Sequence, residues 1–338
     1  MVFSFSLIIP VFNRPDEIRE LLESLISQTY KDPYEIVIVE DGSVTTSEAV
    51  IDHYKGDLKI TYLFKQNTGP GDSRNYGMKH ARGNYFIILD SDCIIPPDYL
   101  EKVAVSLKAH YVDCFGGPDA AHESFSNIQK AINYSMTSVF TSGGIRGNKK
   151  AVDKFQPRSF NMGISKEAFE RSGGFGNIHP GEDPDLSMRL WNEGYESKLI
   201  PEAFVYHKRR ISFSKFFLQV KKFGMVRPIL NSWHPGSARI FYWFPSFFSI
   251  GLVASLFLLL VGQQQYLWPF ILYVAYFTLV FLDALIKNKN LSVAMLAVLA
   301  VLIQFFGYGY GFLKSVILIN FSQSKPEELF PELFFKRI

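Results

Sequence analysis

The stretch YFIILDSDC, residues 85–93, decides the fold. Five apolar residues run without interruption, and Asp90 and Asp92 follow at once, so an apparently buried strand ends in two carboxylates. If the extended backbone persists, its alternation puts both acids on one side and Ser91 on the other. The competing interpretation is a turn in which the aspartates hydrogen-bond their own backbone, and the proline pair at 96–97 favours it.

The surrounding sequence alternates between strand and helix patterns over its first 210 residues. Residues 15–28 carry apolar side chains at helical spacing, with Asn13 as the expected N-cap and Pro15 in the first turn. This order predicts an α/β fold with a mixed, mostly parallel sheet and flanking helices. Ligands bind such sheets beyond the carboxyl ends of the strands. The strands are expected within residues 4–11, 34–41, 59–65, 84–92 and 111–117.

Composition excludes several classes of protein. The net charge of +3, from 35 basic and 32 acidic residues, does not indicate a nucleic-acid-binding protein. Cys93 and Cys114 match neither a disulfide framework nor a metal-ligand spacing, so we expect them to be small core side chains in a reducing compartment. The first residues lack a basic start and are expected to form a strand, not a signal peptide.

The composition changes near residue 240, where long apolar stretches begin. Each is long enough to cross about 30 Å of hydrocarbon at about 1.5 Å per residue. Lys287 and Lys289 lie between the second and third stretches, and the positive-inside rule places that loop and the N-terminal region in the cytoplasm. The expected parts are a catalytic domain at 1–210, an interfacial amphipathic region at 211–240, spans at about 241–262, 266–286 and 291–319, and a tail at 321–338.

The third stretch has an alternative interpretation. Three complete spans would leave Lys336 and Arg337 on the outer side, against the positive-inside rule. A bent or partly interfacial third segment would avoid this. The acceptor loop is expected between Pro118 and Pro157, where the helical pattern is weak.

Acidic residues gather in three blocks of the first 210 residues. Glu40 and Asp41 end the second expected strand, Asp90 and Asp92 end the fourth, and the stretch GEDPD begins at Gly181. Acids at neighbouring strand ends crowd negative charge into one crevice, which costs free energy unless a cation or hydrogen-bond donors answer it. Mg²⁺ and similar hard cations take oxygen ligands and share carboxylates with substrate phosphates. The sequence therefore predicts a divalent metal site.

Five blocks in a fixed order resemble the family 2 glycosyltransferases, which use the GT-A fold. The blocks are IIPVFNR, VIVEDGS, NTGPGDSRNYGMKHARGNYFIILDSDC, FNMGISKEAFERSGGF and GEDPDLSMRLWNEGY, and the resemblance covers roughly residues 4–207. The glycines of the third block permit close backbone approach, and its helix start favours an anion.

The resemblance implies roles for individual residues. Asp183 matches the base that takes a proton from the acceptor hydroxyl, with Glu182 as the alternative. Asp92 matches the metal ligand for Mg²⁺ or Mn²⁺, shared with Asp90 or His207. The donor-binding positions implied are Pro10, Val11, Asn13, Glu40, Asp41, Arg74, Asn75, Asp90 and Ser91.

The expected function is transfer of one sugar, with inversion, from a nucleoside diphosphate sugar, UDP-linked by preference, to a lipid-linked or amphiphilic acceptor. The expected location is the inner cell membrane, spanned several times, with the catalytic domain in the cytoplasm. Transfer to a polyprenyl phosphate is one alternative, and a non-catalytic sugar-nucleotide scaffold is another. The sequence leaves open the sugar, the nucleotide, the acceptor linkage and whether the chain forms a homo-oligomer.

Overall fold

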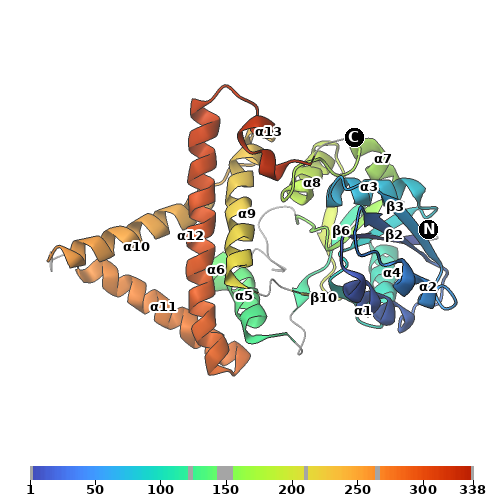
Figure 1. Cartoon of the computed structure of the whole chain (residues 1–338), viewed down its shortest axis with the longest axis horizontal. Coiled ribbons are helices and arrows are strands. Elements are labelled where there is room, and N and C mark those ends of the chain that lie inside the picture. Colours follow the sequence, from blue (N-terminus) through green and yellow to red (C-terminus); the bar gives the residue numbers. More distant parts are fainter. Residues whose placement is uncertain (1–2, 121–124, 143–154, 209–211, 263–266, 336–338) are drawn as a thin grey trace. The chain divides into compact units, whose positions relative to one another are not determined.

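The computed structural model describes residues 3–120, 125–142, 155–208, 212–262 and 267–335, and the chain forms two compact units (Figure 1). The sheet unit comprises Met1–His122, Gly147–Lys208 and Phe334–Ile338. The helical unit comprises Glu123–Arg146 and Arg209–Leu333. This division differs from the expected domain at 1–210, because a segment within the expected acceptor loop belongs to the helical unit and the last residues belong to the sheet unit.

The main sheet has seven strands and is mixed, as predicted. Its order is β3-β2-β1-β4-β8-β6-β9, and the first four strands in this order run parallel. Strand β8 runs antiparallel to both of its neighbours. All five predicted strands are present, as β1, β2, β3, β4 and β6. The bounds are β1 Phe5–Val11, β2 Glu35–Asp41, β3 Ile60–Lys65, β4 Tyr85–Leu89, β6 Cys114–Gly116, β8 Asn161–Ser165 and β9 Ser197–Leu199.

Alternate residues of the central strands feed two cores, one on each face of the sheet. On β1, Leu7 and Ile9 join the core that contains α1, α2 and α4, whereas Ile8 joins the core that contains α3, α7 and α8. Each fully buried side chain of this kind stabilises the fold by about 1.5–3 kcal/mol. The helices are α1 Pro15–Ile26, α2 Glu48–Tyr54, α3 Pro70–His80, α4 Tyr99–Ala109, α7 Lys166–Ser172 and α8 Glu182–Asn192.

Helix α1 begins where the sequence predicts, but its cap is different. Pro15 lies in the first turn, while Arg14 is the N-cap residue and provides no side-chain cap. Asn13 has a φ of 54° and its side chain turns to another loop, so the prediction that it caps α1 is wrong. Cys93 and Cys114 are free and buried, as expected.

The helical unit is built on two long helices, α9 (Phe213–Trp233) and α12 (Leu291–Phe321), which run side by side (Figure 1). Glycines make this packing close: a Cβ on Gly224 or Gly311 would overlap backbone of the facing helix. The apolar side of α9, including Phe216 and Val220, is buried against protein. Its position in a bilayer interface stays a prediction.

Within the expected acceptor loop the chain forms α5 (Asn127–Thr137) and α6 (Val139–Ser142). Ser126 and Gln129 form a capping box at the start of α5. The Tyr134 hydroxyl donates to Asp283 of α11 at 2.6 Å, and Lys287 pairs with the same carboxylate at 2.8 Å. These contacts fasten α5 to the helical unit. Gly143, Gly144 and Gly147 of the expected acceptor loop lie outside the described residues.

Within the part of the chain that the structure describes, three helices are long and apolar enough to cross a membrane, as judged by length and composition. They are Ile240–Leu260, which includes α10 (Phe244–Leu260), then α11 (Leu267–Asn288) and α12. Helix α12 is one uninterrupted helix of 31 residues, and its placement in a membrane stays a prediction. Among its described residues, the helical unit also contains the 3-10 helices η1 (Ile240–Trp243) and η3 (Pro331–Leu333) and the helix α13 (Pro326–Leu329).

Candidate active site

The two aspartates after β4 lie in a turn. The strand ends at Leu89, and the Cys93 N–H donates to the Asp90 carbonyl at 3.1 Å before the short strand β5 (Cys93–Ile94) begins. Alternation of side chains fails here because the extended backbone stops at Leu89. The condition for both carboxylates to share one side is therefore not met, the alternative of a turn is the one observed, and each carboxylate has its own partners.

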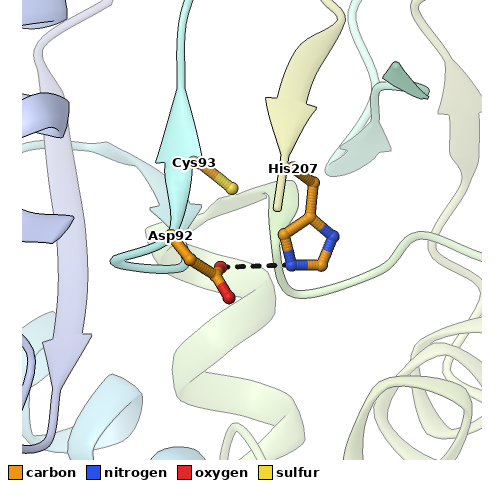
Figure 2. A group of neighbouring side chains, drawn as sticks. All are labelled: Asp92, Cys93 and His207. Carbon is orange, nitrogen blue, oxygen red and sulfur yellow. Dashed lines mark ion pairs between the residues drawn. The ribbon is translucent and has the colours of Figure 1, made fainter. Parts of the chain in front are cut away.

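Asp92 meets a histidine from a distant part of the chain (Figure 2). His207 ends β10 (Val205–His207), which pairs antiparallel with β5 in a small sheet that also contains β7 (Asp119–Ala120). This pairing sets Asp92 Oδ1 3.1 Å from His207 Nε2, and the His207 ring stacks on Phe160 at 4.6 Å between centroids. Arg14 Nη1 lies 3.4 Å from the other oxygen, Asp92 Oδ2.

The Asp92–His207 pair fits a divalent cation. Both side chains are mostly buried, at 14% and 17% exposure, so their orientation is fixed by packing. A carboxylate suits Mg²⁺ and Mn²⁺, and a neutral imidazole is a competent additional ligand. Ligand atoms of Asp92, Cys93 and His207 lie within 4.8 Å of one another. Asp90, the other expected ligand, instead lies against Arg74.

Cys93 is poorly suited to complete this set as a thiolate. Burial, with the charges of Asp92 and Asp90 adding to it, raises the pKa of the thiol well above its usual range. The Sγ atom lies 3.4 Å from the Phe160 carbonyl oxygen, to which the protonated thiol donates. Cys93 therefore keeps its proton and serves as a core side chain.

Arg74 joins two of the acidic blocks. Its Nη2 lies 2.7 Å from Asp90 Oδ1, and its Nη1 lies 3.1 Å from Glu182 Oε1. Burial opposes the charge of Arg74, but Asp90 and Glu182 more than offset this and raise its pKa. The guanidinium, 3% exposed, therefore holds two carboxylates together. The sequence predicted Arg74 beside the donor but gave no sign of its link to Glu182.

Glu182 and Asp183 open helix α8 after Gly181, whose φ of 123° favours glycine. Burial raises the pKa of Asp183, and the Glu182 charge adds to this, giving a value of about 6. For Glu182, burial opposes ionisation, yet His179 and Arg74 lower its pKa. The two acids thus have opposite tendencies, and Asp183 is the one matched to accept and release a proton near neutral pH.

His179 completes this arrangement, and sequence analysis missed it. Its Nδ1 lies 2.8 Å from Glu182 Oε1, the oxygen that also pairs with Arg74. The only signal in the sequence is a histidine three residues before an acid at a helix start, which usually has no functional meaning. Asp183 Oδ1 is buried and makes no hydrogen bond within the described chain.

Glu40 and Asp41, the acids at the end of β2, hold neighbouring loops through hydrogen bonds. Asp41, 4% exposed, accepts from Lys65 Nζ at 2.5 Å and from the backbone N–H groups of Thr68 and Gly69 at 3.0 Å each. Three of its roughly four lone-pair sites are thus occupied, which leaves one for a ligand N–H. Lys65 was not anticipated from the sequence. Neighbouring Glu40, fully buried, accepts from Ser43, the Ser47 N–H and the Tyr62 hydroxyl.

The remaining expected donor residues lie at the same end of the sheet. Pro10 and Val11 end β1 and pair with β2, and Asn13 Oδ1 accepts from the Val44 N–H at 2.8 Å. Two of the expected residues support other segments. Both amide atoms of Asn75 bond the Phe175 backbone, and the Ser91 hydroxyl lies 3.4 Å from Glu17 Oε2.

The sheet is mixed and mostly parallel, and its acids gather beyond the strand ends, where open α/β sheets bind ligands. The GT-A class of nucleotide-sugar transferases has this arrangement. Residues 6–173 match the family model described as glycosyl transferase family 2. Through this segment the chain belongs to that family.

A curated relative in Rickettsia felis, described as an uncharacterized glycosyltransferase, is 37% identical over 142 residues, which cover 41% of this chain and 22% of the relative. The match thus spans about a fifth of that relative's length.

Two solved structures share the fold. A mannosyltransferase from Pyrobaculum calidifontis in complex with GDP-Man and Mn²⁺ has a TM-score of 0.58 at 18% identity, covering 96% of this chain and 89% of that one. Residues 1–349 of Staphylococcus aureus TarS in complex with UDP-GlcNAc give a TM-score of 0.52 at 17% identity, covering 99% of both chains.

Proposed function

We propose that this chain is a metal-dependent, inverting glycosyltransferase that moves a sugar from a nucleoside diphosphate sugar to a lipid-linked or amphiphilic acceptor at a membrane. The observation that carries the proposal is Asp183, a carboxylate with a pKa near 6 and a buried, unbonded oxygen, held beside Glu182 and linked through Arg74 to Asp90. This arrangement suits a base at the end of a donor-binding sheet.

The proposed reaction assigns Asp183 the proton transfer. As the acceptor hydroxyl oxygen attacks the anomeric carbon, Asp183 takes its proton, the new glycosidic bond forms on the face opposite the leaving group, and the bond from sugar to diphosphate breaks. Asp92 and His207 would hold Mg²⁺ or Mn²⁺, with Asp90 as an alternative partner of Asp92. A cation bound there would neutralise the charge that develops on the leaving diphosphate.

The donor class has independent support. Both related folds named above were solved with nucleotide sugars, one carrying guanosine and the other uridine. At this low identity they do not select the base. Asp41 has an acceptor site left for an imide N–H, which uracil and guanine both offer. We infer a UDP-linked or GDP-linked donor.

Three apolar helices support a membrane location. By the positive-inside rule, Lys287 and Lys289 assign the short loop between α11 and α12 to the cytoplasm. We infer an inner-membrane protein with a cytoplasmic sheet unit. An acceptor that shares this membrane, either a glycan lipid or a polyprenyl phosphate, follows from that location.

The test is a screen of the purified full chain in detergent against UDP-glucose, UDP-galactose, UDP-GlcNAc and GDP-mannose, with and without Mn²⁺. Metal-dependent release of one nucleoside diphosphate is expected, and Asp183→Asn should lower it by about 10²–10⁴-fold while nucleotide affinity stays the same. Asp52→Asn, an exposed acid of the same unit, is the control. Donor binding without turnover in any condition would favour a non-catalytic scaffold.

A further inference from the structure

Two residues near the end of the chain belong to the sheet unit. Phe334 and Phe335 cluster with it, although the described residues that precede them, up to Leu333, belong to the helical unit. Phe334 makes an antiparallel bridge with Ile178, and the Phe335 N–H donates to the Asn177 carbonyl at 3.0 Å. The Phe334–Phe335 segment therefore runs along the loop of residues 176–181, which leads directly into α8 and Asp183.

The Phe335 ring fills the space between this loop and the start of α3. A Cβ built on Gly69 would overlap the ring, and Gly69 has a φ of 93°, so the close approach depends on a glycine there. On its other side the ring centroid lies 6.0 Å from that of His179. Phe335 and His179 also border a pocket of about 240 Å³, together with Thr68 and Asn177. The ring thus touches both a donor-site loop and the loop that precedes the base.

His179 connects this contact to the acids. Its imidazole lies 2.8 Å from Glu182 Oε1, and Glu182 is the charged neighbour that adds to the raised pKa of Asp183. The charged groups that face His179 are Glu182, Asp183 and Arg74. Those that face Asp183 are Glu182, Arg74 and Arg158, and Ser159 hydrogen-bonds it. A cation at His179 therefore offsets negative charge beside the base.

We propose that His179 and Phe335 are positioning residues of the transfer reaction: Phe335 packs the 176–181 loop so that His179 stays on Glu182 beside Asp183. This inference rests on the proposed function, because it treats Asp183 as the base. It assigns neither residue any contact with the reacting atoms. Its consequence is that removal of either side chain changes the protonation of the base more than it changes donor binding.

The experiment uses the full chain and the variants His179→Ala, Phe335→Ala, Phe335→Leu and the double variant His179→Ala with Phe335→Ala. Loss of a cation near a carboxylate raises its pKa. His179→Ala should therefore move the acid limb of kcat/KM for donor turnover to higher pH, by about half a unit, which is about threefold in rate below the limb. Phe335→Ala should move the acid limb in the same direction. Phe335→Leu should leave the limb close to its position in the unaltered chain.

The double variant decides whether the two residues act together. In the His179→Ala background, Phe335→Ala should add little, because its effect passes through the imidazole. Additive effects of the two substitutions would overturn the proposal, as would an unmoved limb in Phe335→Ala. Phe321→Ala, which removes a phenylalanine that is 87% exposed on α12, is the control and should behave as the unaltered chain.

A second measurement separates this inference from the proposed function. Imidazole NMR can follow the titration of His179, identified by the signal lost in His179→Ala, without any turnover. Burial lowers the pKa of His179, but the ion pair with Glu182 more than offsets this and raises it, so loss of that pair in Phe335→Ala should bring the pKa down toward 6.5. If the unaltered chain turns over no donor, the proposed function fails while this titration still tests the coupling. An unchanged His179 titration in Phe335→Ala overturns the coupling itself.

Discussion

Replacing Glu182 with glutamine is expected to move the acid limb of the activity profile to lower pH. Asp183 acts as a base only when it is deprotonated, so the rate falls as pH falls through its pKa. That pKa is raised from 3.8 to about 6, first by burial and then by the Glu182 charge. The whole shift corresponds to about 3 kcal/mol, at about 1.36 kcal/mol per unit.

The size of the expected change follows from the order of these causes. Burial contributes most and remains in Glu182→Gln, so the limb should move down by about half to one unit, a relative gain of about three- to tenfold below it. The substitution also weakens contacts with Arg74 and His179, which lowers the absolute rate. The limb position is read from the shape of the profile, so a uniform loss of rate does not affect it.

The assay is kcat/KM for nucleotide release between about pH 4.5 and pH 8, at saturating Mn²⁺. Glu193→Gln at the C-cap of α8 is the matched control and should leave the profile unchanged. A limb that stays in place, or moves up, in Glu182→Gln would refute the idea that Glu182 sets the protonation of Asp183.

Three further predictions concern the metal pair, the thiol and the helix packing. Asp92→Asn should weaken Mn²⁺-dependent binding of the selected nucleoside diphosphate at least tenfold by calorimetry, and equal affinity would count against the metal role. Cys93→Ser should keep the metal dependence of wild type, since the buried thiol retains its proton; loss of metal activation would show that sulfur takes part. Gly311→Ala should destabilise the helical unit by about 1–3 kcal/mol or more in detergent, because its Cβ overlaps the Lys221 carbonyl. Gly56→Ala, which meets nothing within 4 Å, should be neutral, and equal melting of the two variants would contradict the close packing.

The strands and the apolar helices could be predicted from the sequence because a single local signal determines each. Residues 36–39 and 85–89 are apolar and buried throughout, which fits strands covered on both faces of a sheet. Helices α10 to α12 carry long apolar stretches that few soluble helices match. Once the strands were predicted, the acids that come directly after them in the sequence could be placed at the strand ends.

The turn at 90–93 and the fate of α5 depend on information that a local pattern lacks. Side chains alternate between the two faces of the sheet along β4 up to Leu89. The alternation stops there because the chain turns into β5, which pairs with β10, more than a hundred residues later in the chain. Near residue 130 the sequence has only a weak helical pattern, yet the chain forms α5 there because α11 and α12 supply the apolar surface that covers it. In both places a partner distant in sequence decided the conformation.

The pairing of Arg74 shows why the candidate site was only partly predictable. From the sequence, the acid blocks were interpreted as three separate groups of negative charge balanced by a metal, with Arg74 at the donor. In the structure Arg74 is already held by Asp90 and Glu182, so most of its charge is used within the protein. In the proposed reaction, a cation held by Asp92 and His207 would compensate the charge of a bound diphosphate, and the protonation of Asp183 would depend on how Arg74 and His179 share Glu182. The chemistry of this site therefore rests on contacts between residues about a hundred positions apart, which single blocks do not reveal.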